Sequence, residues 1–125
     1  MLFDTDVIVW ALRGNRKAAD RLDAASVLRL SAVSYMELLK GSRDKNDQRM
    51  TTQFVRDMGF ETIPIDADVS HRATVYMEEY ALSAGLDLAD ALVAATAAEH
   101  KIPICTANDK HYKAIPGIEL ELFRP

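Results

Sequence analysis

Two acidic residues follow a short apolar segment at the start of the chain, where their carboxylates could hold a divalent cation. The first ten residues read MLFDTDVIVW, so Asp4 and Asp6 flank a single threonine. A second pair with the same spacing, Asp66 and Asp68, occurs in the stretch IDADV. Spacing alone therefore does not separate a metal site from an ordinary helix start. The distinction depends on whether other acids can reach the same place.

Further candidate ligands lie in separate stretches. They are Glu37 in SAVSYMELLKG, Asp90 in GLDLADALVAATAAEH, and Asn108 with Asp109 in CTANDKHY. Each also has a local interpretation. Glu37 could complete a capping box with Ser34, and Asp90 could be a first-turn acid of a helix capped by Asp87. Asn and Asp are also common turn residues. Both interpretations stay open for each residue.

The alternation of apolar segments and helical patterns predicts the elements that position these residues. Strands are expected at Leu2–Thr5, Val27–Ser31, Glu61–Ile65, Ile102–Thr106 and Ile118–Phe123, and helices at Val7–Leu12, Lys17–Ala25, Tyr35–Lys40, Asp47–Met58, Val69–Leu82 and Leu88–His100. Strands that alternate with helices favour parallel pairing and right-handed crossovers. The sequence therefore predicts an α/β fold, a three-layer α/β/α sandwich with a central parallel sheet of four to five short strands, as a single domain over residues 1–125.

This topology brings distant acids together. In open parallel sheets the ligand crevice lies outside the carboxyl ends of the strands, which is where Asp4 is expected. Glu37 and Asp90 belong to helices that begin near the same edge. Carboxylates that are close together repel one another and take up protons unless a cation offsets them. Because the donors are oxygens and no Cys/His set suited to zinc is present, Mg²⁺ or Mn²⁺ is the expected ion.

The second acidic pair has a simpler explanation. Asp66 and Asp68 precede a helix whose apolar positions, including Val69, Ala73 and Tyr76, have core spacing. Asp66 is interpreted as the N-cap of this helix and Asp68 as a first-turn acid. The same structural role is possible for Asp6, which could serve both a helix start and a metal site.

Other polar residues have weaker signals. The hydroxyls of Thr5 and Thr106 could contact groups near the ion. The histidines, including His111, lack a Ser or Cys partner for nucleophilic catalysis, and Cys105 is expected to be a small buried hydrophobic residue. Trp10 is expected to pack in the core stripe of the first helix. No covalent nucleophile is therefore predicted.

Charge and composition exclude few functions. The net charge is −4, there is one cysteine, and no apolar run approaches the roughly 18 residues of a membrane span. A cytoplasmic protein is expected. Local basic clusters matter more for an anionic substrate than the net charge does. Arg13, Lys40, Arg43 and Lys110 are candidate phosphate contacts, although solvated helix faces explain such clusters equally simply.

The sequence resembles the PIN-domain family, and within it the VapC-type ribonuclease toxins of prokaryotic toxin–antitoxin pairs. The resemblance covers four stretches in order: LFDTDVIVWALRGN, LSAVSYMELLKG, LADALVAATAAEH and CTANDKHYKAIPGIEL. It implies that Asp4 and Asp90 are metal ligands and that Glu37 is the second acid. The Asn108/Asp109 region would supply the variable fourth position. Asp6 stands where many members have Asn.

The resemblance implies a metal-dependent endoribonuclease that cleaves single-stranded regions of RNA. It further implies a homodimer and a small antitoxin that covers the active site. One alternative is a haloacid-dehalogenase-like phosphotransfer enzyme, because the stretch FDTDV is similar to the first motif of that family. Ile8, however, stands where that motif is expected to have Thr or Val. Another is a non-enzymatic interaction module, either receiver-like or an inactive PIN domain.

Overall fold

The computed structural model describes residues 1–125. Its strands are β1 (Leu2–Phe3), β2 (Arg29–Ser31), β3 (Glu61–Ile63), β4 (Ile104–Thr106) and β5 (Leu120–Leu122). Its helices are α1 (Thr5–Leu12), α2 (Arg16–Ala24), α3 (Ala32–Lys40), α4 (Lys45–Asp57), α5 (Ala67–Ala84) and α6 (Leu88–His100), and a short 3₁₀ helix, η1, covers Asp109–His111. The strands form one parallel sheet in the order β3-β2-β1-β4-β5, so β1 is central.

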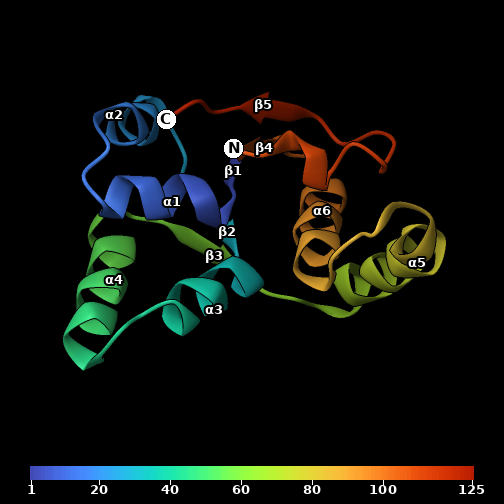
Figure 1. The fold of residues 1–125 in the computed structure, drawn as a ribbon, viewed down its shortest axis with the longest axis horizontal. Helices are drawn as coiled ribbons and strands as arrows, with labels where there is room; N and C mark the ends of the chain where they lie inside the picture. Colours follow the sequence, from blue (N-terminus) through green and yellow to red (C-terminus); the bar gives the residue numbers. More distant parts are fainter.

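Successive side chains of the central strands pack into two separate apolar clusters, one on each face of the sheet. Leu2 and its register partner Ile104 pack into the cluster that α5 and α6 cover. Phe3 and its partner Cys105 pack on the opposite face, with helices α1 to α4. Figure 1 shows α5 and α6 on one side of the sheet and α1, α2 and α4 on the other. The predicted three-layer α/β/α sandwich with a parallel sheet is confirmed.

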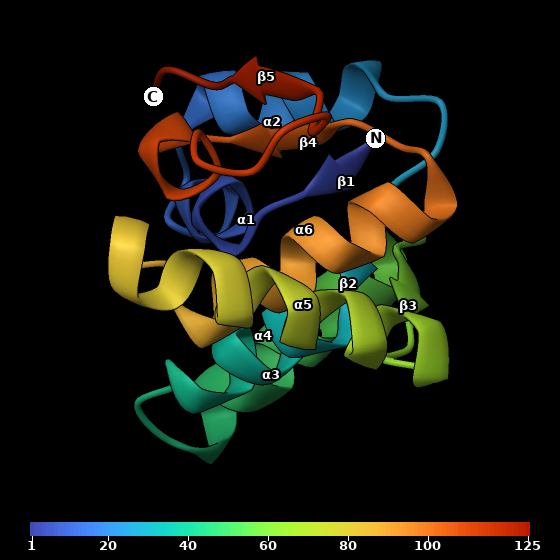
Figure 2. The same ribbon diagram turned by 90° about the vertical axis from the view of Figure 1, so that its right-hand side faces the viewer.

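Helix α6 contacts the sheet closely because its buried face consists mainly of small residues. Ala91, Ala94 and Ala95 have no exposed surface, and Val93 has almost none. In Figure 2, α5 lies across the outer side of α6, so α6 is enclosed between that helix and the sheet. Close packing on both sides fixes the N-terminal end of α6, which carries Asp90.

The prediction located every strand and every α-helix but not η1, and four helix starts, those of α1, α3, α4 and α5, were wrong by two or three residues. α1 begins at Thr5 because Asp4 is its N-cap, and α3 begins at Ala32 because Ser31 caps it. The alternative in which Ser34 and Glu37 form a capping box is therefore excluded. α4 likewise begins earlier than predicted, with Asp44 as its N-cap. In each case the capping oxygen accepts a hydrogen bond from a helix amide that would otherwise lack a partner.

Two further expectations concern apolar residues. Cys105 is completely buried, as predicted. Trp10 is 36% exposed and belongs to neither core cluster, so the prediction that it packs in the core is wrong. None of the helices combines the length and the apolar character that crossing a lipid bilayer requires.

Candidate metal centre

Asp4 lies at the carboxyl end of the central strand, and its carboxylate is held by hydrogen bonds on both oxygens. Oδ1 accepts a hydrogen bond from the Thr5 amide at 2.8 Å, which makes Asp4 the N-cap of α1. Oδ2 accepts from the hydroxyls of Thr106, at 3.0 Å, and Tyr112, at 2.6 Å. Asp4 is 6% exposed. The carboxylate is therefore buried and held in a fixed orientation.

Asp6 is the second residue of α1, and its side chain reaches the residues at the end of β4. Its Oδ2 accepts hydrogen bonds from the Ala107 amide at 3.0 Å and from the Thr106 hydroxyl at 3.3 Å. Its Oδ1 is buried and has no hydrogen-bond partner. Burial, and secondarily the nearby Asp4, raise the pKa of Asp6 above its ordinary value. An orphaned buried carboxylate oxygen is the kind of atom that a cation would satisfy.

Asp90 and His111 complete a compact group with Asp4. One ligand atom from each of these residues lies within 4.8 Å of the others. Asp90 is in the first turn of α6, and its Oδ2 is 3.7 Å from Nδ1 of His111. Burial raises the pKa of Asp90 to about 6; His111 opposes this shift, whereas Asp4 adds to it. The strands and α6 thus assemble a ligand set from residues 4, 90 and 111.

Glu37 projects from the second turn of α3 and is exposed. It makes no capping box, because Ser34 lies inside the helix and its hydroxyl is buried without a partner. Instead, Oε1 of Glu37 accepts a hydrogen bond from the Thr5 hydroxyl at 2.8 Å. Thr5 directly follows Asp4, so this contact ties Glu37 to the edge of the same site. Its other oxygen, Oε2, has no protein partner.

The segment after β4 differs from the expectation for Asn108 and Asp109. Asp109 faces Lys113, with Oδ2 3.6 Å from Nζ, and is not one of the three clustered ligands. Asn108 caps η1 through the Lys110 amide, and its Nδ2 lies 3.1 Å from Nε2 of His111. The residue that joins Asp4 and Asp90 is therefore His111, which η1 carries toward them.

His111 was not predicted as a metal ligand, because the histidines were considered only as partners of a Ser or Cys nucleophile. The available signal was position: His111 follows the end of β4 by five residues, the distance that one short turn covers. Tyr112 was missed as well, because a single buried aromatic residue gives no sign in the sequence that its hydroxyl points at a carboxylate.

The residues at this edge fit a divalent cation. Asp4, Asp6 and Asp90 provide carboxylate oxygens, and His111 can add an imidazole nitrogen. Oxygen-rich sites favour Mg²⁺ and Mn²⁺, and an imidazole is compatible with Mn²⁺. Burial raises the pKa values of Asp6 and Asp90, and no Lys or Arg forms an ion pair with either carboxylate. A bound cation would supply the missing positive charge.

Comparison with known proteins identifies the family. A family model described as "PIN domain" matches residues 1–118. The chain belongs to the PIN-domain family. This membership decides against the haloacid-dehalogenase-like alternative. No curated protein matches the sequence of this PIN domain.

Several solved structures are similar to this PIN domain. A chain of a toxin-antitoxin complex from Klebsiella pneumoniae is 31% identical over 94% of this chain and 93% of that chain, with a TM-score of 0.76. VapBC2 from Rickettsia felis, bound to a DNA fragment from the promoter, has a TM-score of 0.85 at 20% identity over 98% of each chain. FitAcB from Neisseria gonorrhoeae has a TM-score of 0.72 at 23% identity over 95% and 94%. The last two similarities show the fold alone.

Two grooves of this PIN domain meet at Glu37. The first, of about 550 Å³, runs between α1, α3 and α4 and is lined by Arg13 and Arg43. The second, of about 480 Å³, lies beside α6 and is lined by Asp90, His111 and Lys110. Of the predicted phosphate contacts, Arg13, Arg43 and Lys110 line these grooves. Lys40 lines neither of them.

The second acidic pair of this PIN domain has the structural role that was predicted. Asp66 is the N-cap of α5, and its Oδ1 accepts a hydrogen bond from the Val69 amide at 2.9 Å. Asp68 is an exposed first-turn acid. Asp66 follows the edge strand β3, two strands away from β1, and is not one of the three clustered ligands. Position in the fold thus separates the two Asp-x-Asp stretches.

Proposed function

We propose that this PIN domain is a Mg²⁺- or Mn²⁺-dependent endoribonuclease that cleaves single-stranded regions of RNA and acts as the toxin of a toxin–antitoxin pair. The observation that carries the proposal is the convergence of Asp4, Asp90 and His111 within 4.8 Å at the carboxyl ends of the strands. Asp6 and Glu37 lie at the same edge. Family membership and the similarity to toxin–antitoxin complexes support it.

In this proposal Asp4 and Asp90 hold the cation, with Asp6 and His111 as further candidate ligands. A bound divalent cation polarises a phosphate oxygen and lowers the pKa of a bound water. Glu37 has a free Oε2, which can accept a hydrogen bond from the attacking water and take its proton as the water oxygen bonds to phosphorus. The bond between phosphorus and the leaving ribose oxygen breaks in the same step, and that oxygen takes up a proton from solvent. The Thr5 hydroxyl holds the other oxygen of Glu37 and so restrains the carboxylate, which lines the same groove as Asp90 and His111.

Substrate binding would use the two grooves on either side of Glu37. Arg13 and Arg43 line one and Lys110 lines the other, so a single strand could contact basic groups on both sides of the cleaved bond. Arg43 also pairs with Asp47 at 3.5 Å, which reduces its contribution. Phosphate contacts of this kind make affinity fall as salt rises.

The groove between α1, α3 and α4 is also the proposed site for an antitoxin segment. Exposed Met50 and Leu12 line it together with buried Leu38, and Glu37 stands at its end. A small protein with an apolar segment and a basic residue would fill the groove and block RNA. Co-expression with the protein encoded by the adjacent reading frame tests this: a stable complex that Met50→Glu disrupts is expected, and a complex insensitive to that change contradicts it.

We also propose a cytoplasmic homodimer. Leu82 is fully exposed and Leu88 is 61% exposed, at the adjoining ends of α5 and α6, so a second copy could cover this apolar surface. Light scattering on the purified chain should give twice the monomer mass, and Leu82→Glu should return it to a monomer. A monomeric parent chain would contradict this part of the proposal.

The activity is tested on purified protein with a structured RNA that carries single-stranded loops. The parent should cleave loops in Mg²⁺ or Mn²⁺ and lose activity in EDTA. Asp4→Asn should abolish cleavage. Cleavage that survives either EDTA or Asp4→Asn refutes the metal centre. Cation binding without any cleavage by the parent would instead support the inactive interaction module.

A further inference from the structure

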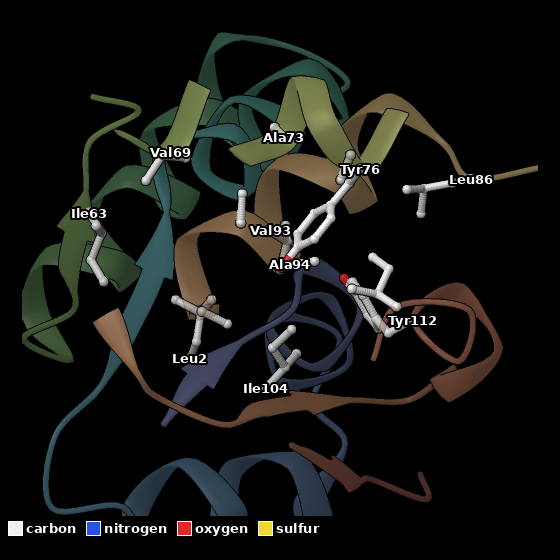
Figure 3. Packing of buried hydrophobic residues seen from close by; sticks show 14 residues of the cluster. Leu2, Ile63, Val69, Ala73, Tyr76, Leu86, Val93, Ala94, Ile104 and Tyr112 are labelled. Atoms are coloured by element: carbon white, nitrogen blue, oxygen red, sulfur yellow. The ribbon is translucent and has the colours of Figure 1, made fainter. Parts of the chain in front are cut away.

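Tyr112 is a buried residue that no part of the proposed reaction uses directly. It is 1% exposed and belongs to the apolar cluster between the sheet and α6, together with Ala94 and Ile104 (Figure 3). Its hydroxyl donates to Oδ2 of Asp4 at 2.6 Å, a short distance typical of hydrogen bonds to carboxylates. A buried tyrosine needs a hydrogen-bond partner for its hydroxyl. The partner of Tyr112 is Asp4, which is a candidate metal ligand.

The hydrogen bonds of Asp4 leave little room for a further ligand. An ionised carboxylate offers about four lone-pair positions on its two oxygens. Oδ2 accepts from both Tyr112 and Thr106, and Oδ1 accepts from the Thr5 amide. One position therefore remains, and it is on Oδ1.

The two hydroxyls on Oδ2 are not equivalent. Thr106 has one hydrogen and three acceptors within reach: Asp4 Oδ2 at 3.0 Å, Asp6 Oδ2 at 3.3 Å and the Asn108 carbonyl at 3.4 Å. The Tyr112 hydroxyl donates to Asp4 alone. The shortest of these contacts is the one to Asp4, so both hydroxyls occupy Oδ2, and Tyr112 is the donor that has no other acceptor.

We infer that Tyr112 is a positioning residue that occupies Oδ2 of Asp4, so that Asp4 binds the divalent cation through Oδ1 only. Tyr112 also directly follows His111, so the same hydrogen bond anchors η1, which carries His111 toward Asp90. The Tyr112 hydroxyl therefore helps to position both Asp4 and His111. The inference rests on the cation site of the proposed function and adds how that site is oriented.

The experiment measures binding of Mn²⁺ and Mg²⁺ by isothermal titration calorimetry, with no RNA present. Tyr112→Phe keeps the ring and removes only the hydroxyl. Loss of a group that orients a metal ligand typically weakens metal affinity by about 10-fold or more, so this is the expected change in Kd. Tyr80→Phe, on α5, is the matched control: its hydroxyl donates to none of Asp4, Asp90 and His111, so this change should leave Kd unchanged. Melting in EDTA shows whether each variant is folded.

A second readout separates positioning from general stability. In an RNA cleavage assay the Mn²⁺ concentration for half-maximal rate should rise by about 10-fold in Tyr112→Phe, while the rate at saturating Mn²⁺ stays near that of the parent. A purely structural defect would lower the saturated rate and leave the half-maximal concentration unchanged. Should Tyr112→Phe fail to fold, Thr106→Val removes the other donor to Oδ2 and should also weaken Kd.

The outcomes are distinct. If the parent binds Mn²⁺ and Tyr112→Phe, or Thr106→Val in its place, binds it with the same Kd, the inference is overturned while the proposed function stands. If the parent binds neither cation, both fail. A parent that binds cations but cleaves no RNA leaves the positioning role of Tyr112 to be decided by the calorimetry alone, and overturns the proposed nuclease.

Discussion

Asp90→Asn is expected to stabilise the metal-free protein at neutral pH. The pKa of Asp90 rises from an ordinary value of 3.8 to about 6, with burial as the largest cause. An acid whose pKa is higher in the folded than in the unfolded chain lowers the free energy of unfolding whenever it is ionised. Taken at full value, this shift corresponds to about 3 kcal/mol.

The expected gain is smaller than this value. The Asp90 side chain keeps 18% of its surface exposed, so solvent screens part of the effect. Asn also loses the favourable interaction of a carboxylate with the N-terminus of α6. Allowing for both, we expect a gain of about 1.5 kcal/mol in unfolding free energy, or about 5 °C in melting temperature for a chain of this size.

The stability difference between Asp90→Asn and the parent should depend on pH in one direction only. Below pH 3.8 the carboxyl is protonated in both the folded and unfolded chains, so parent and variant should be equally stable. Between this pH and about 6 the difference should grow, and above about 6 it should be complete. Melting curves in EDTA at a series of pH values measure it directly.

A divalent cation should reverse the order of stability. Saturating Mg²⁺ at about 100 times Kd adds about 2.7 kcal/mol to a protein that binds it only when folded. The parent should gain this and Asp90→Asn should not, so the parent becomes the more stable protein. A variant that melts below the parent in EDTA at pH 7.5 would show that Asp90 has a structural role, and would refute the assignment of its raised pKa to an unmet charge.

Two other exchanges separate catalysis from helix capping. Glu37→Gln keeps an oxygen for the Thr5 hydroxyl, so its stability should stay within about 0.5 kcal/mol of the parent; RNA cleavage should fall by about 100-fold, and undiminished cleavage would remove Glu37 from the mechanism. Asp66→Ala loses the bond to the Val69 amide and should cost about 1 kcal/mol in a denaturation experiment. Its specific activity should equal that of the parent, and a loss of activity at full stability would mean that the wrong Asp-x-Asp was chosen.

The sequence predicted the parts of the fold that depend on periodicity. Apolar runs and helical patterns located every strand and main helix, because burial of alternating or stripe-like faces is a local property. Helix starts were less predictable. Asp4 directly follows β1, Ser31 is the last residue of β2, and each is also the N-cap of the next helix. The apolar pattern does not show where one element stops and the next begins.

The candidate site could be predicted only in part, for a different reason. Asp4, Glu37 and Asp90 were found because carboxylates near strand ends and helix starts are visible in the sequence. His111 and Tyr112 belong to the site through the path of one short turn after β4, and that path depends on packing against α6. Asp109, the more acidic neighbour, faces Lys113 instead. Residue type alone cannot show which side of such a turn faces the cluster.

The central strand β1 is made first, yet its acid is completed by residues from the other end of the chain. Asp4 takes its hydroxyl donors from Thr106 and Tyr112, which lie 102 and 108 positions later. During translation, a ribosome must therefore synthesise the chain from Asp4 to Tyr112 before the candidate metal centre can form. An unfinished chain would carry Asp4 without these donors and without His111. On the proposed function, a chain that is still being translated would therefore hold no complete nuclease site until residues 106–112 have been made.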